Sequence, residues 1–136
     1  KTLNRLEQVL ARNEWHDDSA FEGLTLDTDG RLICGTMSNV FLIIGQQLIT
    51  PAITRCGVSG VMRRHVLTLL DEADVDFRVR DVDVDELRGA DGVFISNSQI
   101  GILPAKRCGT SSWQPHPVFR WLTRRLRQSG VEEGPA

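Results

Sequence analysis

A pair of glycines that leads into a helix start is the first feature of this sequence that could do chemistry. The stretch RCGVSGVMRR places Gly57 and Gly60 directly before a segment with helical spacing of apolar residues. Backbone N–H groups in the first turn of a helix have no intrahelical partner, so they can hold a phosphate. The stretch has neither the lysine of a Walker loop nor the glycine spacing of a dinucleotide fingerprint. An ordinary turn is the alternative, and the pattern alone leaves both open.

One polar strand end and one lysine are further candidates. Ser96, Asn97 and Ser98 follow the apolar run GVFI, and such a strand end can present hydroxyl and amide groups to an anion or a substrate. A plain polar strand end is the alternative. Lys1 stands beside the start of an amphipathic helix. A lysine there is either a solvated charge or, in a pocket with other cations, a nucleophile with a lowered pKa.

The histidines, cysteines and arginines form no catalytic or metal-binding pattern. His16, His65 and His116 lack ligand or triad spacing, and His65 is expected on a helix surface. The three cysteines are widely spaced without a CxxC pair, which argues against a disulfide framework and a structural zinc site. We expect solvated arginine side chains rather than anion sites at Arg63, Arg64, Arg124, Arg125 and Arg127.

The expected elements mix helices and strands, which predicts an α/β fold. Strand, turn and strand are expected around Asp29-Gly30 and again around Gly45. The expected helices and the remaining strands span about 3–12, 60–70, 76–80, 84–87, 92–95, 99–103 and 116–128. Phe119, Leu122 and Leu126 share one face of the closing helix, and the tail 129–136 is expected to fray. No linker divides the chain, so residues 1–136 are predicted to form a single domain.

The overall composition is that of an ordinary globular chain. The 136 residues are 40% hydrophobic and 25% charged, with a net charge of -2. Nothing in this balance points to a nucleic-acid-binding protein or a membrane-surface protein. No apolar run approaches the roughly 20 residues needed to span a bilayer. The cysteine usage favours a reducing, cytoplasmic setting, with a small molecule rather than a nucleic acid or a membrane as partner.

Several of these stretches, in this order and spacing, resemble the C-terminal half of the fold-type IV pyridoxal-phosphate enzymes. They are KTLNRLEQVLAR, GTMSNVF, GVSGVMRR and ISNSQIGILP, and the resemblance covers nearly the whole chain to Pro104. The family includes branched-chain aminotransferases, D-amino-acid aminotransferases and aminodeoxychorismate lyases. The form KTLNRLEQV is most similar to the lyases. The resemblance implies the C-terminal, pyridoxal 5'-phosphate-binding domain of the D-amino-acid aminotransferase-like fold.

The resemblance also implies which residues contact the cofactor. In the family, a lysine immediately before the first helix forms the Schiff base with the cofactor, and Lys1 matches it. Val61 and Met62 match the two residues whose backbone amides hold the phosphate. Ser98 matches a small residue that also contacts the phosphate, and Asn97 borders the phosphate and the substrate.

The small polar loop along the cofactor ring departs from the family at one position. Ser38 and Asn39 fall on this loop, where a structural role is at least equally expected. The family has a glutamate bonded to the pyridine nitrogen, but Cys34 stands at that position here. A carboxylate keeps the nitrogen protonated, which makes the ring a strong electron sink. A thiol is a weaker partner, so turnover is expected to suffer while the fold does not.

The function implied by the resemblance is cleavage of 4-amino-4-deoxychorismate to 4-aminobenzoate and pyruvate, a step in folate synthesis. An aminotransferase for D-amino or branched-chain amino acids is the alternative, and a non-catalytic folded fragment is a third possibility. The family's N-terminal domain carries an arginine that grips the phosphate, and that domain precedes the position of Lys1. We therefore expect little activity from this piece alone, and a homodimer for the full-length protein.

Overall fold

A mixed five-stranded sheet forms the centre of the computed structural model, which describes residues 4–15 and 20–130. The strands lie in the order β5-β4-β3-β6-β7, with bounds Phe77–Arg80, Gln47–Pro51, Asn39–Ile44, Gly92–Asn97 and Gly101–Pro104. β4 and β5 are parallel, and the other neighbours are antiparallel. A parallel pair needs a crossover connection, and helix α2, Val61–Glu72, lies in the crossover between β4 and β5. The combination of helices with this mixed sheet confirms the predicted α/β class.

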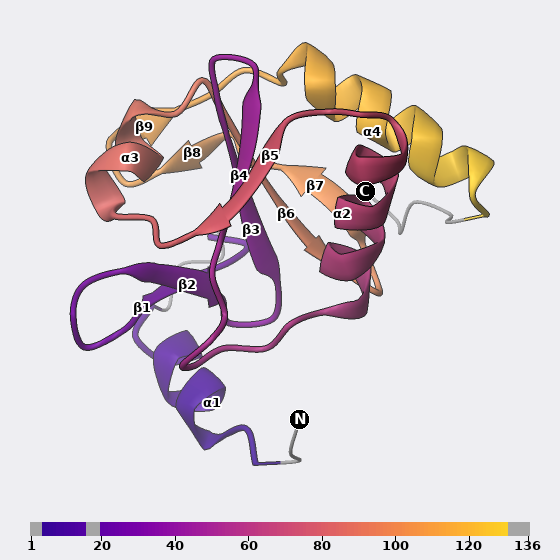
Figure 1. The fold of residues 1–136 in the computed structure, drawn as a ribbon. Helices are drawn as coiled ribbons and strands as arrows, with labels where there is room; N and C mark the ends of the chain where they lie inside the picture. Colours follow the sequence, from indigo (N-terminus) through magenta and orange to yellow (C-terminus); the bar gives the residue numbers. More distant parts are fainter. Residues whose placement is uncertain (1–3, 16–19, 131–136) are drawn as a thin grey trace.

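One face of the sheet is covered by two helices. α2 and α4, Pro117–Gln128, pack on this face (Figure 1). Between helices and sheet, the rings of Phe41 and Phe94 are stacked with their centroids 4.7 Å apart. Leu122 and Leu126 of α4 are buried against this cluster, with Phe119 partly buried beside them, as the spacing predicts.

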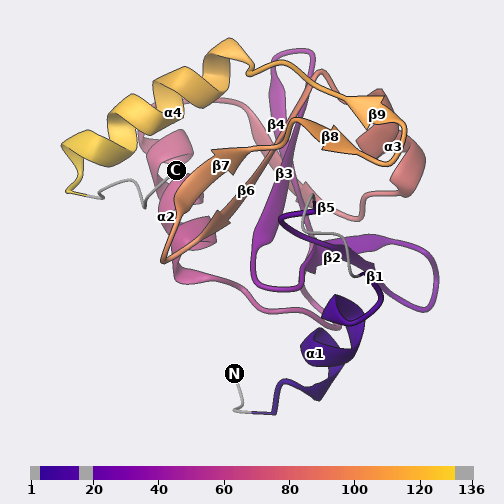
Figure 2. The same cartoon turned by 180° about the vertical axis from the view of Figure 1, so that it is seen from behind.

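The opposite face of the sheet is covered by shorter elements, seen in Figure 2. β2, Leu32–Gly35, and α3, Val84–Gly89, contribute Leu32 and Leu87 to a second buried cluster. Trp113 is buried in the same cluster, and its Nε1 donates a hydrogen bond to the Ala90 carbonyl at 2.9 Å. Because the central strands are buried on both faces, they read as continuous apolar runs rather than as an alternating pattern.

The structure contains both predicted turns at the predicted positions. Gly30 closes the loop between β1, Leu24–Leu26, and β2 with φ 79°, and Gly45 joins β3 to β4 with φ 61°. Both conformations lie in the left-handed region, which glycine adopts without steric cost. A short hairpin, β8 Arg107–Cys108 with β9 Ser111–Ser112, has no counterpart among the predicted elements.

Helix α2 corrects one prediction. Arg63 is buried, with 7% of the residue exposed, so it does not lie on a solvated face. Its guanidinium donates to the Pro51 carbonyl at 3.1 Å and contacts the Thr50 hydroxyl at 3.4 Å. These neutral oxygens offset part of the cost of burial, and the remaining desolvation lowers the pKa of Arg63. Its neighbour Arg64 is exposed, as expected.

Helix α1, Leu6–Arg12, differs from the other helices because none of its residues is buried. It extends away from the sheet at the N-terminal end of the described chain (Figure 1). Arg5 occupies the N-cap position without a side-chain cap, and the Asn4 side chain accepts a hydrogen bond from the Leu6 N–H at 3.2 Å. The apolar side chains of Leu6, Val9 and Leu10 are exposed.

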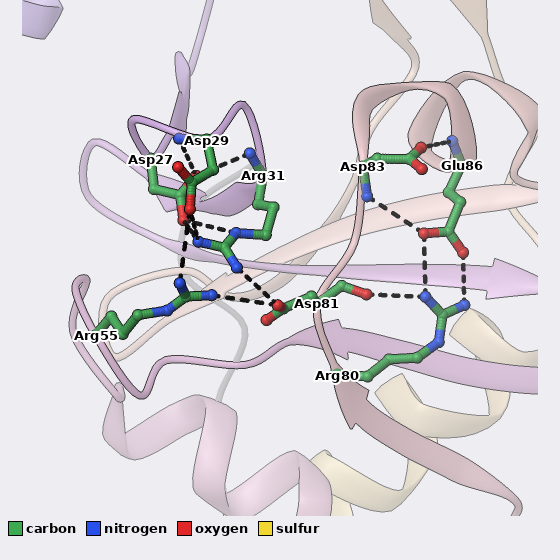
Figure 3. A network of polar contacts seen from close by, with 8 residues as sticks. All are labelled: Asp27, Asp29, Arg31, Arg55, Arg80, Asp81, Asp83 and Glu86. Atoms are coloured by element: carbon green, nitrogen blue, oxygen red, sulfur yellow. Dashed lines mark hydrogen bonds and ion pairs between the residues drawn. The ribbon is translucent and has the colours of Figure 1, made fainter.

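Helix α3 begins with a capping box. Asp83 accepts from the Glu86 N–H at 2.7 Å, and the Glu86 carboxylate accepts from the Asp83 N–H at 3.2 Å. Glu86 also pairs with Arg80 at the end of β5, at 2.6 Å (Figure 3). The side-chain hydrogen bond from Arg80 lowers the pKa of Glu86.

Candidate functional site

A cavity of about 370 Å³ lies where the start of α1, the loop before β3, the loop before α2 and the β6–β7 turn meet. Six of the predicted site residues line it: Cys34, Ser38, Asn39, Val61, Asn97 and Ser98. Met62 does not, because its side chain is buried in the core beneath α2. Lys1 lies outside the described residues, and Asn4 and Arg5, which follow it closely in sequence, line the cavity.

The start of α2 forms one wall of the cavity. Gly60 occupies the N-cap position, no side chain caps the helix, and no acidic residue lies in its first turn. The backbone N–H groups of Val61 and Met62 therefore lack intrahelical partners. Such a helix start, which carries a partial positive charge, suits a phosphate.

Asn39 fixes the loop that leads into this helix start. Its Oδ1 accepts from the Gly60 N–H at 3.0 Å, and its Nδ2 donates to the Val58 carbonyl at 2.8 Å. A Cβ at position 60 would lie 2.4 Å from Asn39 Oδ1, so the close approach requires glycine. The structural role expected as an alternative for Asn39 is thus what the contacts show.

The β6–β7 turn forms a second wall. Asn97 Oδ1 accepts from the N–H groups of Gln99 and Ile100, both at 2.9 Å, and its Nδ2 donates to the Met37 carbonyl at 3.2 Å. Asn97 thereby ties the turn to the loop before β3. Ser96, next to it, is completely buried at the cavity wall, and its hydroxyl has no hydrogen-bond partner within the described ranges.

Cys34 lies in β2 and lines the cavity. Its Sγ is 3.5 Å from the Thr25 hydroxyl, and burial raises the pKa of the thiol. A raised pKa keeps the thiol protonated and neutral at physiological pH. All three cysteines of the chain, Cys34, Cys56 and Cys108, are free.

A carboxylate that the sequence patterns did not single out lies directly behind the cavity wall. Glu22 has only 7% of its side chain exposed, and it accepts from the Thr36 hydroxyl and from the Ser38 hydroxyl, the latter at 2.7 Å. It also accepts from the backbone N–H groups of Thr36 and Met37, at 3.1 and 3.2 Å. No local pattern could have revealed this role, because Glu22 lies in an irregular polar stretch and its partners follow 14 to 16 positions later.

A partly exposed network of charges anchors the outer side of the same region (Figure 3). Arg31 contacts Asp27 at 2.8 Å and Asp81 at 3.0 Å, and Asp29 is its third partner. Arg55 joins the network through Asp81 at 3.3 Å. The backbone N–H of Arg31, with its guanidinium, lowers the pKa of Asp27. The network holds the β1–β2 turn to the segment that continues into the cavity wall.

The residues present fit a phosphorylated ligand. The uncapped helix start, the cavity-lining Ser98 and the unpartnered buried hydroxyl of Ser96 offer donors without a competing carboxylate in the first helical turn. The described residues contain no group of three histidine, cysteine or acidic side chains that could hold a metal ion. No helix within the described ranges is long and apolar enough to cross a membrane.

Comparison with known proteins agrees with this geometry. The family described as amino-transferase class IV matches residues 1–108. The chain belongs to this family. Class IV aminotransferases are fold-type IV enzymes, and their cofactor is pyridoxal phosphate. The resemblance stated from the four motifs is therefore confirmed.

The relatives that match the chain include lyases and aminotransferases. The chain is 34% identical to the aminodeoxychorismate lyase of Vibrio harveyi over 93% of its own length and 47% of that protein. It is 33% identical to the D-alanine aminotransferase of Bacillus licheniformis over 98% of its length and 48% of that protein. The crystal structure of 4-amino-4-deoxychorismate lyase from Pseudomonas aeruginosa is 44% identical with a TM-score of 0.89, and the match covers 93% of this chain and 47% of that one. The chain thus spans about half the length of these relatives.

Proposed function

We propose that this chain is the cofactor-binding part of a pyridoxal-phosphate lyase that converts 4-amino-4-deoxychorismate to 4-aminobenzoate and pyruvate, in the cytoplasmic synthesis of folate. The observation that carries the proposal is the cavity in which the start of α1, which closely follows Lys1, faces the uncapped start of α2. The similarity to the lyase of Pseudomonas aeruginosa, 44% identical, supports the lyase over the other members.

The proposed roles follow from where the residues lie. The backbone amides of Val61 and Met62 and the hydroxyl of Ser98 would hold the cofactor phosphate at the positive end of α2. Asn97 would border the phosphate and the substrate from the β6–β7 turn. Cys34, which lines the cavity, would face the pyridine nitrogen.

Lys1 would supply the amine of the reaction. When bound, pyridoxal phosphate acts as an electron sink that stabilises a carbanion next to the substrate nitrogen. The Lys1 amine would hold the cofactor before the substrate arrives, then take a proton from the substrate ring and return one as pyruvate leaves. Proton transfer by a positioned group contributes roughly 10²–10⁴-fold to the rate. The amine must be neutral for this role, so nearby cations and partial desolvation would lower the pKa of Lys1.

The alternative is an aminotransferase, favoured by the 33% identity to the D-alanine enzyme over nearly the whole chain. Both reactions use the same lysine and phosphate site, and they differ in the substrate pocket. The full-length protein is therefore assayed for 4-aminobenzoate release from aminodeoxychorismate and for half-transamination with D-alanine and branched-chain amino acids. Release of 4-aminobenzoate without amino-acid turnover supports the lyase, and the reverse result overturns it.

The proposal concerns the full-length protein, which we expect to form a homodimer. The chain spans about half the length of its relatives, and we propose that it would supply only part of the substrate pocket. We therefore expect the 136-residue piece alone to show little or no lyase activity. Turnover by the purified piece near the rate of the full-length protein would contradict this expectation.

A further inference from the structure

We infer that Glu22 is a positioning residue, whose buried carboxylate shapes the loop 36–38 and thereby sets the distance between opposite walls of the cofactor cavity. The inference rests on the proposed function for what the cavity binds, but the contacts themselves do not depend on it. Glu22 does not line the cavity, so it would act only through the loop.

First, the Glu22 carboxylate accepts hydrogen bonds from the N–H and O–H groups of the loop, so these donors point to the same side. Its Oε1 accepts from the Thr36 N–H and hydroxyl, and its Oε2 accepts from the Met37 N–H and the Ser38 hydroxyl. The Gly23 N–H also donates to Oε1 at 3.0 Å, so the carboxylate, which only accepts, has its acceptor sites occupied. Hydrogen bonds to an ionised acceptor are roughly twice as strong as neutral ones.

The second step is that the loop's acceptors then face the other way, toward the cavity. The Thr36 carbonyl accepts from Arg5 Nη2 at 3.2 Å, and the Met37 carbonyl accepts from Asn97 Nδ2 at 3.2 Å. Arg5 belongs to the segment that follows Lys1, and Asn97 belongs to the β6–β7 turn. The carboxylate of Glu22 therefore orients one loop that holds two cavity walls.

The third step is that the chain makes room for this carboxylate. A Cβ at Gly35 would lie 2.7 Å from Glu22 Oε2 and 2.4 Å from Ser38 Oγ. Gly35 is buried, and its φ is not positive, so space rather than backbone conformation requires glycine there. The nearest described cation is Arg12 Nη1, 4.0 Å from Glu22 Oε1, so the N–H and O–H groups of the loop carry most of the stabilisation.

The charge can be separated from the shape of the side chain. Glu22→Gln keeps the length and one acceptor oxygen, but its NH₂ group must face either backbone N–H groups or hydroxyls. The Ser38 hydroxyl can turn to accept a hydrogen bond, whereas the Met37 N–H cannot. The variant therefore leaves at least one backbone donor of the loop facing another donor, while it fills the same space.

The experiment uses the full-length protein, with Glu22→Gln as the test variant and Glu14→Gln as a matched control. Glu14 is exposed and lies outside the cavity lining. Hydrogen exchange of the Met37 amide is measured on the cofactor-free protein, because the Thr36 N–H also donates to the Gly23 carbonyl at 3.0 Å. The dissociation constant is measured for pyridoxal phosphate. In Glu22→Gln we expect exchange and the dissociation constant each to rise about 10- to 100-fold, as loss of charge-assisted hydrogen bonds implies. Glu14→Gln should match the wild type in both.

The outcomes separate this inference from the proposed function. Exchange at Met37 that is unchanged in Glu22→Gln would overturn the inference, whether or not the cofactor binds. An equal rise in exchange at β3 amides would also overturn it, because that pattern indicates general destabilisation rather than loss of loop order. A wild-type protein that does not bind pyridoxal phosphate overturns the proposed function instead, while faster loop exchange in the variant still supports the contacts assigned to Glu22.

Discussion

The central strands β3 and β6 carry consecutive buried apolar side chains, whereas the cavity wall formed by residues 35–39 and 57–60 is built from small and polar residues with two exceptions, Met37 and Val58. The sheet is covered on both faces, so burial of apolar surface stabilises it without a need for exact polar pairing. The wall instead depends on individual side chains, among them Glu22, Asn39 and Asn97. By fixing the segment that enters α2, Asn39 leaves the backbone N–H groups of Val61 and Met62 open to a ligand, which a packed apolar layer cannot do.

The largest loss of stability is expected from a substitution in the core that packs against the sheet. Phe94→Ala removes a completely buried ring that stacks on Phe41, and the resulting cavity should lower the free energy of unfolding by about 3–5 kcal/mol. Phe21→Ala is the control, because Phe21 is 50% exposed and should change stability far less. Urea unfolding of both variants measures the difference. Equal destabilisation by the two variants would contradict the assignment of the core.

A smaller loss of stability, together with weaker ligand binding, is expected from a substitution in the polar wall of the cavity. Asn39→Ala removes two hydrogen bonds, from the half-buried Gly60 N–H and to the Val58 carbonyl, each worth about 0.5–1.5 kcal/mol of unfolding free energy. Because these groups position the start of α2, phosphate and cofactor binding should weaken in the full-length protein as well. Asn39→Asp keeps the acceptor and loses only the donor, so it should fall between the wild type and Asn39→Ala. A variant that loses stability but binds pyridoxal phosphate normally would argue against this role.

The substitution Cys34→Glu tests the role of the cavity by adding a negative charge to its lining. A carboxylate facing the pyridine nitrogen would keep it protonated, and a gain of 1.4 kcal/mol in carbanion stabilisation corresponds to about tenfold in rate. We expect faster turnover of the full-length Cys34→Glu protein, little change for Cys34→Ala, and none for Cys108→Glu on the exposed β8 strand. If aromatisation of the substrate ring drives the reaction, Cys34→Glu will leave the rate unchanged and the proposed handicap is wrong.

The smallest effect is expected from the partly exposed charges around Arg31. The pKa of Asp27 is lowered in the folded protein, so the unfolded chain binds more protons near its own value of about 3.9. The stabilisation is therefore complete above the unfolded pKa and disappears as the pH falls through the lower, folded value. Urea unfolding at pH 6 and near pH 3 should show a smaller difference between the two pH values for Asp27→Asn than for the wild type. An identical pH dependence of the two proteins would contradict this prediction.

Local patterns identified most of the fold. The turns at Gly30 and Gly45 and the helices α2 and α4 follow from residue spacing, because their determinants lie within a few positions of one another. The β8–β9 hairpin was missed because its strands are two residues long and carry no apolar alternation. Local spacing also failed to predict the burial of Arg63. Its position on α2 does not show that oxygens of Thr50 and Pro51 in β4 accept hydrogen bonds from its guanidinium.

The sequence by itself determined the family, through motifs whose order and spacing are fixed by the cofactor they would hold, and it located the glycine-led helix start and the departure at Cys34. Only the tertiary structure decided that Cys34, Asn97 and the start of α2 line one cavity, that Asn39 holds the helix entrance, and that Glu22 lies behind the loop. The physical reason is that a hydrogen bond between distant segments depends on where folding places both partners, and no periodicity in either segment records that distance.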